Sequence, residues 1–511
     1  MKNLKRSIPY IIAACLMVIV FPACKRDFLD RYPQGRYTED NYPYPEGSGP
    51  FDVTLFAAYD VLRSYDASGS GFIAATSIRS EDADKGSTPT DGPTSREMDE
   101  FTLIATNGIV EGMWNGYYNL IGKCNNVLDT IAKDTRTDQQ VKTYAEAEAK
   151  FLRGYGYFML VRLFGRVPLV DKAYRTKEEQ TNIPQSDPAA IYTLIENDLS
   201  FAAANLPPIW DKNIFPGRAT SGAANGILAK AFLTQKKWGM AMSTAKKVMD
   251  SRLYDLKTSY NVIFGEDGEN SSESVFEIQN TANLTEKRAN GSQFASIQGV
   301  RGSGDWNLGW GFNVPSPQLA AAYEPGDPRK ARTFLTMGEP SVYGEVFTAS
   351  NQAADAPKSY NHKVHSNPAR RKALLDNFSY WMNIRLLRYA DVVLMYAEAA
   401  NELGGESNID EALASVNSVR ARARGSNSNI LPNIDTRDQG SLRDVIRHER
   451  RIELAMEHDR FFDLVRWGIA KDVLHAAGKT NFQAGKHELL PIPANQILIS
   501  KGVLTQNPFY N

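Results

Sequence analysis

Apolar side chains recur every three or four residues along several long stretches of this chain, which restricts those stretches to helices with one buried face. The clearest run covers residues 114–131. Its apolar positions are Trp114, Tyr117, Ile121, Cys124, Leu128 and Ile131. Because Cys124 shares this face, we interpret it as a small core side chain rather than a nucleophile.

Two further helices have recognisable ends. Residues 147–162 repeat an apolar pattern that Gly165 and Pro168 bring to a close. Residues 191–206 follow Asp187 and Pro188 and stop before Pro207 and Pro208. Proline fits the first turn of a helix but interrupts its interior, so these positions indicate helix boundaries.

Two segments have the character of repeated helical hairpins. Residues 220–254 and 389–424 each contain two apolar runs and are close to the tetratricopeptide period of about 34 residues. Small alanines allow two helices to approach closely, and both segments place them on the expected inner faces. They are Ala224, Ala231, Ala241, Ala245, Ala399, Ala400 and Ala412. We therefore predict a mostly α fold built on tetratricopeptide-like helical hairpins.

Long polar or glycine-rich segments separate the helices, at residues 63–100, 256–318 and 330–377. Loops of this length in a folded protein are usually functional or mobile. We expect helices to form the scaffold and long loops to form an irregular ligand-binding face. We expect an N-terminal region at 24–220 and a C-terminal region at 221–511, the latter with long loops at 256–377 and the hairpin at 389–424, joined in one compact unit.

The first 23 residues read as a lipoprotein signal peptide. Lys2, Lys5 and Arg6 precede an apolar run at 11–21 that is too short to cross a bilayer. Ala23 and Cys24 follow, as at a lipoprotein cleavage site, so we predict that Cys24 is acylated and holds the chain on a membrane. An ordinary secretory signal with an incidental cysteine is the alternative.

Charge and cysteine content exclude some classes of function. The formal net charge is −1, which argues against a general nucleic-acid binder. Of the three cysteines, Cys15 lies in the leader and Cys24 is the predicted lipid site. Cys124 alone remains, so we expect neither an intramolecular disulfide nor a cysteine metal cluster.

The most highly charged stretch, 447–468, does not have the spacing of a catalytic site. His448 and Glu449 begin like a zinc protease motif, but Ile452 occupies the position that a second histidine needs. Arginines and glutamates three or four residues apart instead favour a structural ion-pair network. We assign no catalytic residue, no metal site and no cofactor.

Trp306, Trp310 and Phe312 lie in a glycine-rich loop, and we predict that they contact ligand. Sugar rings pack on flat aromatic rings, and exposed aromatic rings are unfavourable without a partner. In the other long loop, Tyr65, Arg79, Asp82 and Asp84 could supply hydroxyl and charged partners. The alternatives are that both tryptophans pack in the core and that these polar groups are only solvated.

An ordered set of short motifs occupies residues 27–30, 148–153, 165–169, 387–391, 396–399, 449–454, 460–464, 466–468, 490–493 and 506–508. Through these motifs the chain resembles the SusD/RagB family of outer-membrane nutrient-binding lipoproteins of Bacteroidetes. The motifs cover essentially the whole chain after Cys24. Each is weak alone, but their order is specific.

The resemblance implies a non-enzymatic protein at the cell surface, lipid-anchored in the outer membrane. Such proteins bind oligosaccharides, or peptides in some members, and act with a SusC-like TonB-dependent transporter. Binding residues differ between members, so the aromatic loop is not implied by the family. A surface glycoside hydrolase and a helical-repeat adaptor remain the competing functions.

Overall fold

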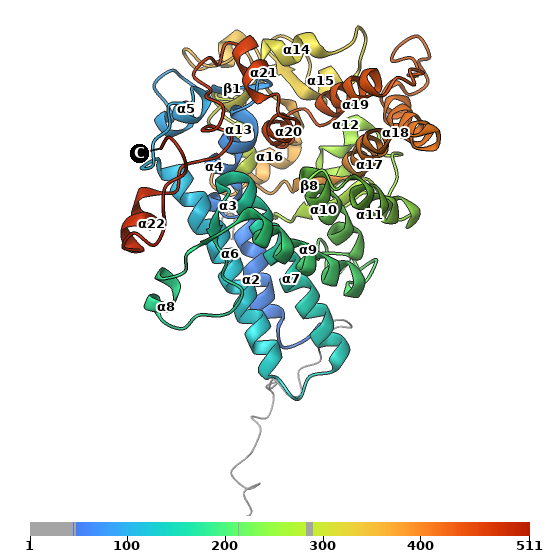
Figure 1. Cartoon of the computed structure of the whole chain (residues 1–511). Coiled ribbons are helices and arrows are strands. Elements are labelled where there is room, and N and C mark those ends of the chain that lie inside the picture. Colours follow the sequence, from blue (N-terminus) through green and yellow to red (C-terminus); the bar gives the residue numbers. More distant parts are fainter. Residues whose placement is uncertain (1–43, 45–47, 213, 283–289, 511) are drawn as a thin grey trace, which may run out of the picture. The chain divides into compact units, whose positions relative to one another are not determined.

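Long helices form where the apolar periodicity predicts them. The computed structural model describes residues 44, 48–212, 214–282 and 290–510. Helix α6 (Gly108–Lys133) and helix α7 (Gln139–Phe164) pack together, and α2 (Asp52–Leu62) and α9 (Pro188–Asn205) lie against them (Figure 1). The side chains of Asn107 and Asp138 accept backbone N–H bonds at the first turns of α6 and α7, which fixes where each helix begins.

The two predicted hairpins are confirmed. The first consists of α10 (Ser221–Thr234) and α11 (Trp238–Asp250), and the second of α17 (Tyr389–Leu403) and α18 (Glu406–Arg424). Helix α11 packs on α17, and α19 (Gln439–Glu453) packs on α17 and α18, so the hairpins form a continuous tetratricopeptide-like array (Figure 1). The predicted mostly α fold is therefore correct.

The long loops contain only short elements. The described residues contain four two-stranded antiparallel sheets: β1 (Ala83–Gly86) with β5 (Phe312–Pro315), β2 (Val167–Pro168) with β3 (Gln185–Ser186), β4 (Ser274–Ile278) with β8 (Ile384–Arg388), and β6 (Phe334–Thr336) with β7 (Ser359–Asn361). The shorter helices are α3 (Tyr65–Ser68), α4 (Ser70–Ile73), η2 (Ala74–Ile78), α5 (Pro93–Asp99), α8 (Lys177–Thr181), α12 (Tyr260–Ile263), η3 (Glu266–Gly268), α13 (Phe294–Gln298), η4 (Gly304–Trp306), α14 (Pro317–Ala322), α15 (Arg329–Thr333), η5 (Ala349–Asn351), η6 (His362–Val364), α16 (Pro368–Leu374), α20 (Arg460–Trp467), α21 (Ala470–Ala476) and α22 (Ala494–Ile499).

Cys124 lies fully buried in the main hydrophobic core, with Tyr117 and Ile121 of the same helix. Burial raises the pKa of its thiol well above the usual value, which keeps the thiol protonated and unreactive. The interpretation of Cys124 as a core side chain is confirmed.

The charged stretch after residue 447 takes part in a structural ion-pair network, as predicted, but its glutamates pair with arginines of other elements and not with arginines three or four residues away on the same helix. Glu453 of α19 is fully buried, and its carboxylate oxygens lie 2.9 Å from Arg388 Nη2, 2.5 Å from Arg422 Nη2 and 3.2 Å from Arg329 Nη1. Burial opposes the charged form of Glu453, but the arginines outweigh it and lower its pKa to about 2. The network ties α19 to β8, α18 and α15, and so connects the scaffold to the loop-bearing elements.

Residues Phe51–Asn511 form one compact unit. The predicted signal peptide at 1–23 and the predicted lipidation site Cys24 lie outside the described residues. The expected division between 24–220 and 221–511 stays a prediction. No helix in the described ranges combines the length and the apolar character that crossing a bilayer requires.

Candidate functional site

A short β-ladder joins the two loops that the sequence singles out. Strand β1, from the loop at 63–100, pairs with β5, which follows the glycine-rich loop. In this register Gly86 lies opposite Phe312 and Ala83 opposite Pro315. Residues more than 200 positions apart are thereby held side by side.

Further hydrogen bonds bring in a third loop. Arg63 donates to the backbone and side-chain oxygens of Asn290 at 2.7 and 3.1 Å. Ser292 and Tyr380 exchange two backbone bonds, and the Ser296 hydroxyl donates to the Asn377 carbonyl at 2.5 Å. Residues 377–380 are therefore fixed beside α13, next to the glycine-rich loop.

Two aromatic rings meet at this junction. The backbone N–H of Trp310 donates to the Ser296 carbonyl, and the Trp310 ring contacts Phe378 edge to face, with 5.4 Å between ring centroids. The Phe378 side chain is 56% exposed, whereas Trp310 and Phe312 are half-buried against the core. We call Trp310, Phe312 and Phe378 the aromatic face. Tyr65 is also exposed and lies on α3, immediately before α4, which contacts α13.

Polar groups line the same loops. The Arg301 guanidinium lies 2.5 Å from the Asp91 carboxylate and donates to the Ser87 hydroxyl at 3.3 Å. A hydrogen bond from Ser87 and, less strongly, the charge of Arg301 lower the pKa of Asp91. The ammonium of Lys85 lies 5.6 Å from the centroid of the Phe312 ring. Hydrogen-bonding groups therefore adjoin the aromatic face: Arg301 and Asp91 form an ion pair, and the Lys85 ammonium donates to the backbone carbonyls of Thr88 and Asp91.

Trp306 is not part of this exposed surface. Its side chain is 7% exposed and stacks on His365, with 5.6 Å between ring centroids, inside a cluster with Phe347 and Tyr360. Trp306 therefore occupies the core position that the sequence left open as an alternative.

Arg79 and Asp82 are also enclosed. The Arg79 guanidinium donates to the His487 carbonyl and lies over the Phe461 ring at 4.0 Å. Asp82 is buried and lies 2.6 Å from Arg451. Both side chains are occupied by contacts within the protein, so we base the proposed ligand contacts on Trp310, Phe312, Phe378 and Tyr65.

Sequence reasoning missed Phe378, Arg63 and Arg301. Phe378 is an aromatic residue in an otherwise polar stretch, and this composition was the one sequence signal for it, although its exposure could be known only from the structure. Arg63 and Arg301 carry no such local signal, because their partners come from distant loops. Across the described residues, no group of three or more His, Cys, Asp or Glu side chains is arranged to hold a metal ion.

The fold and this face together define a class of protein that presents an aromatic loop surface on a tetratricopeptide-like helical scaffold. Comparisons with known proteins identify the family. The SusD family model matches residues 272–510, and a model described as "Starch-binding associating with outer membrane" matches residues 70–233. The chain belongs to the SusD/RagB family, as its ordered motifs predicted.

Relatives match over most of the chain. SusD-like protein P2 of Formosa agariphila is 29% identical over 85% of this chain and 87% of its own length. A SusD-like protein of Bacteroides ovatus is 28% identical over 88% of this chain and 80% of its own length. A solved laminarin-binding SusD-like protein is 29% identical, with a TM-score of 0.74 over 90% of this chain and 99% of its own. These names describe SusD-like or binding proteins rather than enzymes.

Proposed function

We propose that this protein binds oligosaccharide at the aromatic face without altering it chemically. The observation that carries the proposal is the contact between the half-buried Trp310 ring and the exposed Phe378 ring at the junction of three loops. The laminarin-binding relative supports a glycan as the ligand.

The chemistry of the face suits a sugar chain. The C–H faces of sugar rings pack on aromatic rings, and their hydroxyls need donors and acceptors. Ser87, Asp91 and Arg301 supply such groups beside Phe312. Bridging waters complete many of these contacts, as in other polar interfaces.

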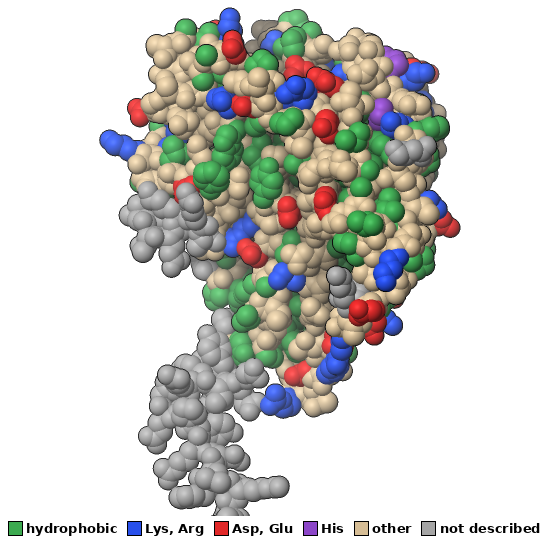
Figure 2. Space-filling model, turned by 90° about the vertical axis from the view of Figure 1, so that its left-hand side faces the viewer, with side chains coloured by type: hydrophobic (Ala, Val, Ile, Leu, Met, Phe, Trp, Pro, Cys, Tyr) green, Lys and Arg blue, Asp and Glu red, His purple; other side chains and the backbone are tan. Residues whose placement is uncertain are grey.

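The charge arrangement favours an uncharged glycan. Arg301 is neutralised by Asp91, and Arg63 lies 2.5 Å from Asp60. On the side of the molecule that Figure 2 presents, Lys and Arg side chains are interspersed with Asp and Glu rather than gathered in a basic field. A sulfated or uronic-acid polymer would find Arg301 and Arg63 already paired with carboxylates, so a neutral glucan such as laminarin is the first ligand to test.

We infer that the protein acts at the cell surface. The name of the family model, with its reference to the outer membrane, supports that location. Lipidation of Cys24 would provide the anchor, and a SusC-like TonB-dependent transporter is the proposed partner that receives the glycan. No nucleic acid is expected among the partners.

A binding panel tests the proposal. The full chain, purified in detergent, is titrated calorimetrically with laminarin, starch, a uronic-acid polymer and a short peptide mixture. We expect heat from a neutral glucan and no release of reducing ends after prolonged incubation. Absence of binding to every glycan would refute the proposed ligand class, and new reducing ends would establish a hydrolase instead. Co-purification with a TonB-dependent transporter from native membranes tests the partner.

A further inference from the structure

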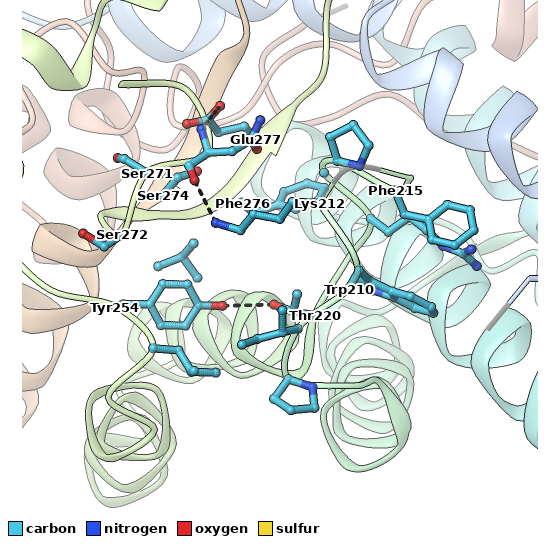
Figure 3. Close-up of a pocket in the computed structure, with 18 residues that line it drawn as sticks. Trp210, Lys212, Phe215, Thr220, Tyr254, Ser271, Ser272, Ser274, Phe276 and Glu277 are labelled. Carbon is cyan, nitrogen blue, oxygen red and sulfur yellow. Dashed lines mark hydrogen bonds between the residues drawn. The ribbon is translucent and has the colours of Figure 1, made fainter. Parts of the chain in front are cut away.

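Two recesses share no lining residue with the aromatic face, and they differ in the space that they offer. The recess beneath the segment that links α9 to α10 has a volume of about 130 Å³ (Figure 3). Lys212 extends across it and donates its ammonium to the Asn270 carbonyl at 3.0 Å, so the protein's own side chain takes up part of the space. The other recess, between α6 and α22, has a volume of about 300 Å³, at the lower end of the range of about 300–1,000 Å³ for ligand pockets. We call it the α6 cleft.

Hydrogen bonds fix the walls of the α6 cleft in place. Three parts of the chain line it: helix α6, the segment from β2 to β3 that contains α8, and α22 with the residues after it (Figure 1). The Tyr118 hydroxyl donates to the Pro168 carbonyl at 2.8 Å. The Asn125 amide donates to the carbonyls of Val170 and Lys172 at 2.8 and 3.2 Å. The cleft is therefore formed before any ligand arrives, as ligand pockets usually are.

A glycine keeps the helical wall of the cleft open. The α6 residues that line the cleft follow one helix face: Trp114, Asn115, Tyr118, Gly122 and Asn126. A Cβ at Gly122 would meet no atom of another part of the described chain within 4 Å, whereas a Cβ at Gly112 or Gly116 would approach Asp66 to 2.9 Å. Close packing therefore accounts for Gly112 and Gly116 but not for Gly122. Since glycine is unfavourable inside a helix, we attribute Gly122 to the space that it leaves in the cleft.

The polar and aromatic side chains of the cleft suit a hydroxylated ring. Asn115, Asn126 and Gln496 contribute side-chain amides. Gln496 Nε2 donates to Asn115 Oδ1 at 3.2 Å, which leaves the Asn115 NH₂ group and the Gln496 oxygen for other partners. Amides donate to and accept from hydroxyls, and the half-buried rings of Tyr118 and Tyr174 offer surface to the C–H face of a sugar.

Lys172 gives the cleft a positive charge. Among the described residues that line the cleft, it is the one charged side chain, and its ammonium lies 5.4 Å from the centroid of the Tyr174 ring. The Glu179 carboxylate of α8 is not among these lining residues and accepts the backbone N–H groups of Arg175 and Thr176 at 3.0 and 3.3 Å. A carboxylate in the cleft would therefore meet the Lys172 ammonium without an acidic group in the described wall.

We propose that the α6 cleft is a second binding site, which takes a single hydroxylated ring that carries a carboxylate, such as a uronic acid residue. The ring packs on Tyr118 and Tyr174, and its carboxylate pairs with Lys172. The matched neutral sugar lacks this ion pair and should bind about two- to fivefold more weakly, as expected for an ion pair that stays exposed to solvent. The inference does not depend on the proposed function, because no residue of the aromatic face lines the cleft.

Saturation-transfer NMR titrations of the full chain in detergent test the ligand. The probes are methyl glucuronide and methyl glucoside, which differ only at C6. We expect the lower dissociation constant for the glucuronide, and Lys172→Gln should remove the difference. Failure of the glucuronide to bind, or binding no tighter than that of the glucoside, would overturn the proposal.

Gly122→Leu locates the bound sugar. Leucine is more favourable than glycine inside a helix, so this variant should fold, and the new side chain occupies the cleft from α6. We expect a loss of glucuronide binding of roughly tenfold or more. Gly239→Leu makes the same change on α11, where a Cβ also meets nothing within 4 Å, and should leave binding unchanged.

Two results would refute the cleft as the site. One is unchanged glucuronide binding in Gly122→Leu, and the other is loss of glucuronide binding in Trp310→Ala, which would assign this sugar to the aromatic face. Both concern the glucuronide alone, so the binding of neutral glucan at the aromatic face is still judged by the glycan panel.

Discussion

Replacing Glu453 by Gln should lower the free energy of unfolding by about 3–5 kcal/mol, the usual cost of leaving buried charges without their partner. The substitution keeps the size of the side chain but removes the one carboxylate that Arg388, Arg422 and Arg329 all face. Partial compensation comes from Glu273, which also pairs with Arg388 and Arg422. Equilibrium denaturation in urea gives the measurement.

Asp444→Asn on the same helix is the matched control. Asp444 is exposed, so the same loss of one negative charge should change stability by less than about 0.5 kcal/mol. If the free energy of unfolding of Glu453→Gln also stayed within about 1 kcal/mol of the parent value, the ion-pair network would not have the stabilising role that we assign to it.

The difference in free energy of unfolding between the parent protein and Glu453→Gln should depend on pH, because the pKa of Glu453 is lowered in the folded state. The pKa of a glutamate in an unfolded chain is about 4.3, as in model peptides, whereas the pKa of Glu453 in the folded protein is about 2. A lowered folded-state pKa adds stability that is fully present above the unfolded value and disappears as the pH falls through the folded value. The difference in free energy of unfolding between the parent and Glu453→Gln should therefore be constant near neutral pH and should decrease as the pH falls from about 4 to about 2. Urea midpoints of both proteins, measured between pH 7 and pH 2, test this prediction. A stability difference that increased on acidification would contradict the lowered pKa of Glu453.

Phe378→Ala should weaken glycan binding roughly ten- to a hundredfold, since a ring of this size contributes about 1.5–3 kcal/mol when a ligand covers it. Trp310→Ala should have a similar or larger effect. Because the two rings touch, the double variant should lose less than the sum of the single losses. Calorimetric titration with the best ligand of the glycan panel provides the comparison.

Phe509→Ala is the matched control for this experiment. Phe509 is 59% exposed, close to the 56% of Phe378, and lies near the C-terminus. It should leave both folding and binding unchanged. Full retention of binding in Trp310→Ala and Phe378→Ala would place the glycan elsewhere on the protein.

The candidate site was only partly visible in the sequence. The sequence predicts that the glycine-rich loop and the loop at 63–100 contact ligand, and the pairing of β1 with β5 holds the two loops together. Phe378 was missed because its contact with Trp310 joins residues 68 positions apart and leaves no local pattern. Arg79 and Asp82 seemed available as polar loop residues, yet His487, Phe461 and Arg451 from the end of the chain enclose them.

The amino-acid order alone was enough to specify the long helices near 114–131, 147–162 and 191–206, the two helical hairpins and the core position of Cys124, because each depends on spacing within a few turns of backbone. Only the folded chain could separate Trp306 from Trp310. They lie four residues apart in one loop, but His365 and Phe347 cover the first and leave the second beside an exposed Phe378. Exposure is a property of long-range packing, and no short-range periodicity encodes it.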